Sequence, residues 1–314
     1  MAEGLRLSGF ETRELPMADG GEGTLDALLA SAGGVPRRAR VTGPLGEPVD
    51  AVWARLADGV AVVEMARASG LTLVEERDPL RASTRGTGEL IAAAIRDGAK
   101  RVIVAVGGSA STDGGLAAVE ALGWSIAGVE IVVACDVSTT FVRAAAEFAP
   151  QKGATRAQVA LLERRLQRLA DAYRSRTGVD VTSIPGAGAA GGLAGGLAAL
   201  GARLEAGFDV VADAAGLDVL VEHADLVVTG EGSVDASSFE GKVVGGVIEL
   251  ASSAGVSAGV IAGAVADDAR DRLEPDVPVR ALVDRAGSVA EAFSRARALA
   301  YEAAIELGAA ELAR

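Results

Sequence analysis

Short apolar runs alternate with longer amphipathic segments along most of this chain. The runs are rich in β-branched residues and predict strands at Val60–Met65, Arg101–Val106, Ile131–Ala134, Leu226–Thr229 and Gly259–Ala262. The segments between and around them predict helices at Gly23–Ala32, Thr87–Asp97, Leu116–Leu122, Arg156–Arg176, Gly191–Leu200, Lys242–Ala254 and Ser288–Ala310. Several strands are apolar at every position, which is typical of strands covered on both faces. The pattern therefore predicts an α/β fold with mostly parallel sheets.

The length of the chain favours more than one hydrophobic core. At 314 residues a single core is close to its upper size, so we expect two domains or one large α/β unit. The loop over residues 41–48 holds Gly43, Pro44, Gly46 and Pro48 and is a candidate boundary. We find no signal peptide and no apolar run of the roughly 20 residues that span a bilayer, so we expect a soluble cytoplasmic protein.

The amino-acid composition excludes several kinds of disulfide and metal site. A single cysteine, Cys135, excludes an internal disulfide and a thiolate metal cluster, and a single histidine, His223, excludes a histidine-rich metal site. The formal net charge is −13 and the chain has no basic block, so nucleic acid is not an expected partner. An anionic substrate would have to be held by backbone N–H groups, a few placed cations or a metal.

The first glycine loop with carboxylates covers residues 17–24 and leads directly into a predicted helix. It contains Asp19, Gly20, Gly21, Glu22 and Thr24. Successive glycines allow the backbone to approach a ligand, and the helix start offers free N–H groups to an anion. Two carboxylates suit a magnesium ion or a reacting hydroxyl. The alternative is a tight turn whose acids only favour the start of the helix.

The second such loop, residues 107–115, follows the apolar strand at Arg101–Val106. It supplies Gly108, Ser109, Thr112 and Asp113 at the carboxyl end of a strand, where ligands collect in open α/β sheets. The alternative is an ordinary helix N-cap.

The third loop follows the strand at Leu226–Thr229 and contains Glu231, Asp235 and Lys242. It does not match a P-loop, because Ala236 and Val243 stand where that motif needs Gly and Ser or Thr. The two acids and the lysine instead form a candidate constellation for phosphoryl transfer.

Further candidates come from single positions and a fourth glycine loop. Residues 185–192 match G-x-G-x-x-G, but they lack the preceding buried strand of a dinucleotide site, so a helix entry or a substrate loop is favoured. Asp136 ends a strand and is a site candidate, whereas we expect Cys135 to pack as a small apolar residue and His223 to lie in a turn. Lys152 and Lys242 each lie beside Gly before a helix, where an ammonium could meet phosphate.

Taken together, these segments resemble the bacterial type 1 glycerate kinases, which are not P-loop kinases. The matching stretches, in family order, are PMADGGEGT (16–24), GPLGEPV (43–49), VEMARASGL (63–71), STRGTGELI (83–91), VGGSASTDGG (106–115), ACDV (134–137), FAPQKGA (148–154), PGAGAAGG (185–192) and TGEGSVDASSFEGKV (229–243). The resemblance implies two α/β domains, one inserted in the other, with D-glycerate and Mg·ATP bound between them. It places the outer domain at residues 1–45 and 220–314 and the inserted domain at 46–219, and it implies phosphoryl transfer to a glycerate hydroxyl, expected at C2.

The resemblance also suggests roles for the candidate residues. The expected catalytic residues are Asp19, Glu231, Asp235 and Lys242, and the expected metal ligands are Asp19, Asp136 and Glu231. The expected contacts to substrate or phosphate are Gly20, Gly21, Glu22, Thr24, Gly108, Ser109, Thr112, Asp113, Lys152 and Gly188. Which acid serves as base and which binds Mg²⁺ stays open, as does the oligomeric state.

Several departures from the family pattern keep alternatives open. The family resemblance implies a first strand and an Asp- and Lys-containing loop before AEGLR, which here occupies residues 2–6. Ser233 and Ser237 stand where Arg and Gln are common in the family. One alternative is therefore a family member that keeps a binding cleft without catalysis. A further alternative is an NAD-dependent oxidoreductase that uses residues 186–191.

Overall fold

The computed structural model describes residues 1–270, 272 and 277–313, and its contacts divide the chain into two compact units. Unit 1 consists of Met1–Pro16 and Ala212–Arg314, and unit 2 consists of Met17–Val211. Unit 2 is thus inserted between the two segments of unit 1 along the chain. The expected boundary at residues 45 and 46 falls inside unit 2, in the turn of a hairpin whose strands pair Thr42 with Pro48.

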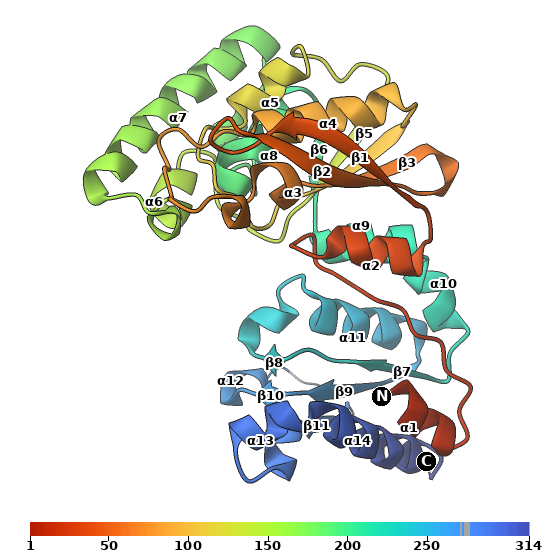
Figure 1. The fold of residues 1–314 in the computed structure, drawn as a ribbon. Helices are drawn as coiled ribbons and strands as arrows, with labels where there is room; N and C mark the ends of the chain where they lie inside the picture. The colour runs from red at the N-terminus through yellow and green to blue at the C-terminus, as the bar shows by residue number, and fades with distance from the viewer. Residues whose placement is uncertain (271, 273–276, 314) are drawn as a thin grey trace. The chain divides into compact units, whose positions relative to one another are not determined.

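A six-stranded sheet forms the centre of unit 2 (Figure 1). Its strands lie in sequence order: β1 (Val35–Thr42), β2 (Pro48–Arg55), β3 (Val60–Glu64), β4 (Arg101–Ala105), β5 (Glu130–Ala134) and β6 (Arg203–Glu205). The pairs β1–β2 and β2–β3 are antiparallel, and the pairs from β3 to β6 are parallel. The predicted α/β class with mostly parallel sheets is confirmed.

The helices of unit 2 cover this sheet and extend beyond it. They are α2 (Thr24–Ser31), α3 (Ala66–Ser69), α4 (Arg85–Arg96), α5 (Leu116–Ala121), α6 (Ala144–Phe148), α7 (Arg156–Thr177), α8 (Ala189–Ala199) and α9 (Gly207–Ala215), the last of which runs on into unit 1. Each predicted helix of this unit is present, and no end differs from the prediction by more than two residues.

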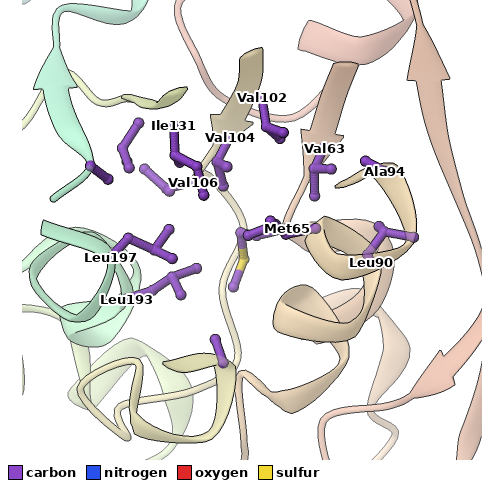
Figure 2. Packing of buried hydrophobic residues seen from close by; sticks show 14 of the residues in the cluster. Val63, Met65, Leu90, Ala94, Val102, Val104, Val106, Ile131, Leu193 and Leu197 are labelled. Carbon is purple, nitrogen blue, oxygen red and sulfur yellow. The ribbon is translucent and has the colours of Figure 1, made fainter. Parts of the chain in front are cut away.

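The main core of unit 2 lies between one face of the sheet and helices α4 and α8. Figure 2 shows Val63, Val104 and Ile131 from the sheet between Leu90 of α4 and Leu193 of α8. Alternate strand positions, such as Val62, Ile103 and Val132, are equally buried on the opposite face. Burial on both faces explains why these strands are apolar throughout.

Unit 1 has its own parallel sheet of three strands, in the order β11 (Val279–Ala281), β9 (Ser257–Ala262) and β7 (Leu226–Thr229). A short pair, β8 (Ser233–Val234) and β10 (Ala264–Val265), lies after β7 and β9 in the chain. Its helices are α1 (Ala2–Leu7), α10 (Leu217–Glu222), α11 (Val243–Ala254), α12 (Asp267–Arg270), α13 (Val289–Ser294) and α14 (Ala296–Glu311).

Two features of unit 1 differ from, or add to, the sequence prediction. The single helix expected over Ser288–Ala310 is two helices, because the chain leaves helical geometry at Arg295, where α13 ends and α14 starts. The first and last helices, α1 and α14, lie side by side (Figure 1), and the Ser8 hydroxyl donates to the Ile305 carbonyl over 3.1 Å. Among the described residues, no helix has both the length and the apolar character needed to cross a bilayer.

Candidate functional site

The carboxyl ends of the parallel strands β3, β4 and β5 lie at one edge of the unit 2 sheet, and the first glycine loop packs against this edge. The Val106 amide, just after β4, donates to the Gly20 carbonyl over 3.1 Å. Gly20 has φ +88°, and a Cβ there would lie 2.8 Å from the carbonyl oxygen of Ala134 at the end of β5. Only glycine fits so close to this strand, which places Asp19 and Glu22 where open α/β sheets collect ligands.

Glu64, at the end of β3, holds this loop in place and was not among the sequence candidates. Its carboxylate is 3% exposed and accepts hydrogen bonds from the amides of Gly23 and Leu25, over 3.2 and 3.3 Å. The Arg67 guanidinium lies 3.6 Å away. A buried carboxylate at the start of α2 satisfies its free N–H groups. The only sequence signal is one acid at the end of the otherwise apolar run VAVVE.

The side chains of the first loop differ in how freely they could meet a ligand. Asp19 is half-buried, and its Oδ1 accepts from the Gly21 amide over 3.2 Å. Glu22 is exposed, and its carboxylate lies against Gly108, where a Cβ would come within 2.0 Å of Oε1. Thr24 is buried, and its hydroxyl donates to the Gly21 carbonyl over 2.8 Å, so it stabilises the loop from within.

Asp136 lies next to the same loop. Its Oδ1 accepts from the Gly207 amide over 2.7 Å, and Gly207 packs so tightly on Asp19 that a Cβ would lie 1.7 Å from the Asp19 carbonyl oxygen. The structure therefore brings Asp19 and Asp136 into one region although 117 positions separate them in sequence. Cys135 packs with the main core as expected, and burial raises the pKa of its thiol.

The second loop is held by Asp113. Its Oδ2 accepts from the Thr84 amide (2.9 Å) and hydroxyl (2.8 Å), and its Oδ1 accepts from the Gly115 amide (3.1 Å). Burial raises the pKa of Asp113, and these hydrogen bonds partly offset the rise. The hydroxyls of Ser111 and Thr112 are buried and have no hydrogen-bond partner among the described residues. Buried hydroxyls without partners are uncommon in folded proteins and call for an explanation.

Lys152 lies beneath the second loop. It ends the 3-10 turn Pro150–Lys152, and its side chain is almost fully buried, with 2% exposure. Its ammonium donates to the Ser109 hydroxyl over 2.6 Å and to the Ser111 carbonyl over 2.5 Å. Burial lowers the pKa of Lys152 to about 7, although the nearby charge of Asp113 acts in the opposite direction.

The fourth loop packs against the second instead of forming a dinucleotide site. The segment before it is the 3-10 turn Val181–Ser183, not the strand that a dinucleotide fingerprint requires. Ala190, Gly191 and Gly192 have φ of 52°, 66° and 93°, and a Cβ at Gly191 would lie 2.1 Å from the Ser111 carbonyl oxygen. Gly188 packs on the backbone of residues 139 and 140, and its amide donates to the Thr139 carbonyl over 2.9 Å.

In unit 1 the predicted acid and lysine residues are linked through two serines. The Lys242 ammonium donates to the Ser237 hydroxyl over 2.8 Å, and this hydroxyl donates to Asp235 Oδ1 over 2.6 Å. The Ser238 hydroxyl donates to Glu231 Oε1. The hydrogen bond from the Ser237 hydroxyl is the main reason why the pKa of Asp235 is low, and Lys242 contributes. Sequence reasoning noted Ser237 only as a departure from the family, but it joins two candidates.

His223 is exposed at the end of α10, and its Nδ1 lies 2.7 Å from the Val219 carbonyl oxygen, as expected for a turn histidine. Within the described ranges, no group of three or more His, Cys, Asp or Glu side chains converges as a metal site. Unit 2 thus brings Asp19, Glu22, Gly108, Ser109 and Asp136 to one sheet edge, and unit 1 gathers Glu231, Asp235 and Lys242. Carboxylates, hydroxyls and the backbone N–H groups of glycine loops can together orient a substrate hydroxyl and bind an anion.

Comparison with known proteins gives consistent matches. The sequence profile of the glycerate kinase family matches residues 1–128 and 124–310. Glycerate 2-kinase of Escherichia coli (strain K12) is 43% identical over 274 residues, which cover 76% of this chain and 72% of that protein. Glycerate kinase of Bacillus subtilis (strain 168) is 40% identical over 282 residues, covering 78% and 74%. A crystal structure of a protein assigned as glycerate kinase 2, from Salmonella typhimurium LT2, matches with a TM-score of 0.84 and 34% identity, over 99% of this chain and 92% of that one.

Proposed function

Because this chain belongs to the glycerate kinase family, we propose that it transfers the γ-phosphate of ATP to the C2 hydroxyl of D-glycerate. The name of the E. coli relative, glycerate 2-kinase, supports transfer to C2. The observation that carries the proposal is the sheet edge of unit 2, where two glycine loops with carboxylates and hydroxyls pack against each other, Gly107 against Gly21 and Gly108 against Glu22. The cytoplasmic location predicted from the sequence stays a prediction.

Phosphoryl transfer is mainly a matter of positioning and of balancing charge, and the proposed roles follow from this. Asp19 and Glu22 are the side chains of the first loop that remain accessible, and they suit hydrogen bonds to glycerate hydroxyls. Gly20, Gly21 and Gly108 have no side chains and would allow the backbone to approach the substrate closely. Ser109 and Thr112 supply hydroxyls. In unit 1, Glu231, Asp235 and Lys242 keep their proposed catalytic roles, with Lys242 as a cation for phosphate.

The carboxylates of the chain fit a magnesium ion that arrives with ATP. Mg²⁺ in kinases is typically held by one or two carboxylates together with phosphate oxygens, so a cluster of three protein ligands is not required. Asp19 and Asp136, which lie in one region of unit 2, would hold it. Glu231, in unit 1, stays a metal ligand predicted from the sequence. When bound, Mg²⁺ would neutralise charge on the phosphates.

ADP release in the presence of D-glycerate and Mg·ATP tests the proposal directly. We expect turnover, and ³¹P NMR of the product should show the phosphate on C2. ATP binding without any ADP release would favour the alternative of a family member that keeps a binding site without catalysis.

The role of Asp19 has its own matched test. Asp19→Asn should lower kcat by about 10² or more, because it removes the negative charge that orients the hydroxyl or the metal. Asp50→Asn is the control, since Asp50 is exposed on β2 and outside both proposed clusters. Equal kcat values for the two variants would rule out the proposed role of Asp19.

A further inference from the structure

The hydrogen bond from Lys152 to Ser109 determines the direction of the Ser109 hydroxyl proton. A charged ammonium has three donors and no acceptor, so Lys152 can only donate to Ser109 Oγ. Ser109 must therefore direct its own O–H away from Lys152. Among the described residues no acceptor for this O–H is found, and Ser109 is half-buried at the sheet edge, where it remains accessible.

Lys152 itself cannot easily reach a ligand. It is 2% exposed, and two of its donors are taken by Ser109 and by the Ser111 carbonyl. Ser109 follows Gly108, whose α-carbon lies against the Glu22 carboxylate. Ser109 thus directly follows a residue that contacts the first loop at Glu22, the acid proposed to bind glycerate hydroxyls.

We propose that Lys152 is a positioning residue that acts through Ser109, holding the Ser109 hydroxyl as an outward donor to an oxyanion of the substrates. The oxyanion is the carboxylate of D-glycerate or a phosphate of ATP. A hydroxyl that accepts from a cation is a stronger donor, because hydrogen bonds in a chain polarise one another. This inference rests on the proposed function, and it gives the buried lysine an indirect part in binding.

The charged groups around Lys152 fit this arrangement. Asp113, in the same loop, attracts the ammonium but is already bonded to Thr84 and Gly115. Arg77 packs on Gly153, and its guanidinium donates to the Gln151 carbonyl over 2.7 Å. On α6, Glu147 accepts from the Thr139 hydroxyl over 2.7 Å. If Lys152 loses its proton, its nitrogen becomes an acceptor and the Ser109 O–H can turn inward, so a bound oxyanion should favour the charged lysine.

The chain contains only three lysines, which makes a direct measurement possible. Protein with ¹³C-labelled lysine should give three resolved side-chain signals, assigned with Lys100→Met and Lys242→Met. We expect saturation with D-glycerate, or with a non-hydrolysable ATP analogue and Mg²⁺, to raise the pKa of Lys152 by about one unit. The ligand that causes the rise identifies the source of the oxyanion. No rise with either ligand would overturn the inference.

Kinetics of variants provide a second readout. Ser109→Ala should lower kcat/KM about tenfold or more, mainly through the KM of the substrate that carries the oxyanion. Lys152→Met should act on the same KM, and the double variant should be no more than about twofold worse than Ser109→Ala alone. In the wild type, kcat/KM should fall as the pH rises past about 7, and Lys152→Met should lose this fall.

Controls separate this inference from the proposed function and from misfolding. Lys100→Met changes an exposed lysine and should keep wild-type kinetics. Circular dichroism reports whether Lys152→Met folds, and Ser109→Ala offers a second variant if it does not. Absence of wild-type turnover would refute the proposed function. Turnover with additive losses in the double variant, or with an unchanged pH profile in Lys152→Met, would refute the role of Lys152 alone.

Discussion

At the scale of single residues, burying the ammonium of Lys152 on folding costs free energy. Removing a charge from water costs several kcal/mol even after relaxation, and only part is recovered from Ser109, the Ser111 carbonyl and the charge of Asp113. The cost makes the stability of unit 2 depend on pH.

The sign of this dependence follows from the two protonation states. The native pKa of Lys152 is about 7 and its ordinary value is 10.5, so between these values the unfolded chain binds more protons. Stability should therefore rise with pH in this window, by up to about 1.4 kcal/mol per pH unit, and be flat below it. Urea unfolding between pH 7.5 and 8.5, followed by tryptophan fluorescence, should show this slope in the wild type. Lys152→Met should lack it, and parallel slopes would contradict the prediction.

The sequence alone indicated part of the candidate site but not the residues that hold its loops in place. Glycines beside acids or hydroxyls, in loops that precede helices, were sufficient to single out Asp19, Ser109 and Glu231 as candidates. The sequence could not reveal Glu64, because its partners are amides 39 to 41 positions away. Hydrogen bonds between segments distant in sequence leave no local pattern. The roles assigned to the individual site residues stay predictions.

At the scale of elements, the buried parallel strands and the long helices were predictable because their apolar pattern follows directly from burial. The β1–β2 hairpin was not predicted. β1 has the sequence VPRRARVT and is mostly exposed at the edge of the sheet, so its polar side chains hide the strand pattern. Arginines on an edge strand also discourage pairing with other chains.

The left-handed turn at the start of α8 allows a matched test at this scale. Gly191→Ala should lower the free energy of unfolding by about 2 to 4 kcal/mol, because it adds a clash with the Ser111 carbonyl to the strain of a positive φ. Gly178→Ala is the control. Gly178 has φ +78° and no atom within 4 Å of the position that a Cβ would take, so this substitution should cost only about 1 kcal/mol. An equal decrease in the free energy of unfolding for both variants, measured in urea, would show that the contact with Ser111 is unimportant.

At the scale of the whole molecule, each unit has a core of its own. The core between the sheet and helices α4 and α8 belongs to unit 2, and the cluster around Leu299, Ala303 and Leu307 belongs to unit 1. Both tryptophans, Trp53 and Trp124, lie in unit 2, so their fluorescence reports this unit while far-ultraviolet circular dichroism reports both.

Separate cores predict separate unfolding transitions. Leu193→Ala, in unit 2, should lower the urea midpoint seen by fluorescence, since such core truncations cost about 2 to 5 kcal/mol. Leu307→Ala, in unit 1, should shift only part of the circular dichroism transition and leave the fluorescence midpoint in place. Equal shifts of the fluorescence midpoint in both variants would show that the chain unfolds as one cooperative unit.

The pairing of α1 with α14 has a consequence for synthesis on the ribosome. All of unit 2 has left the ribosome before the second segment of unit 1 is complete, so it can fold while translation continues. Helix α1 is made before unit 2, yet its partner α14 is made after it. Gly4 and Leu5, which pack on the side of α14 and its cluster in the folded protein, therefore remain without these contacts while the whole of unit 2 is made.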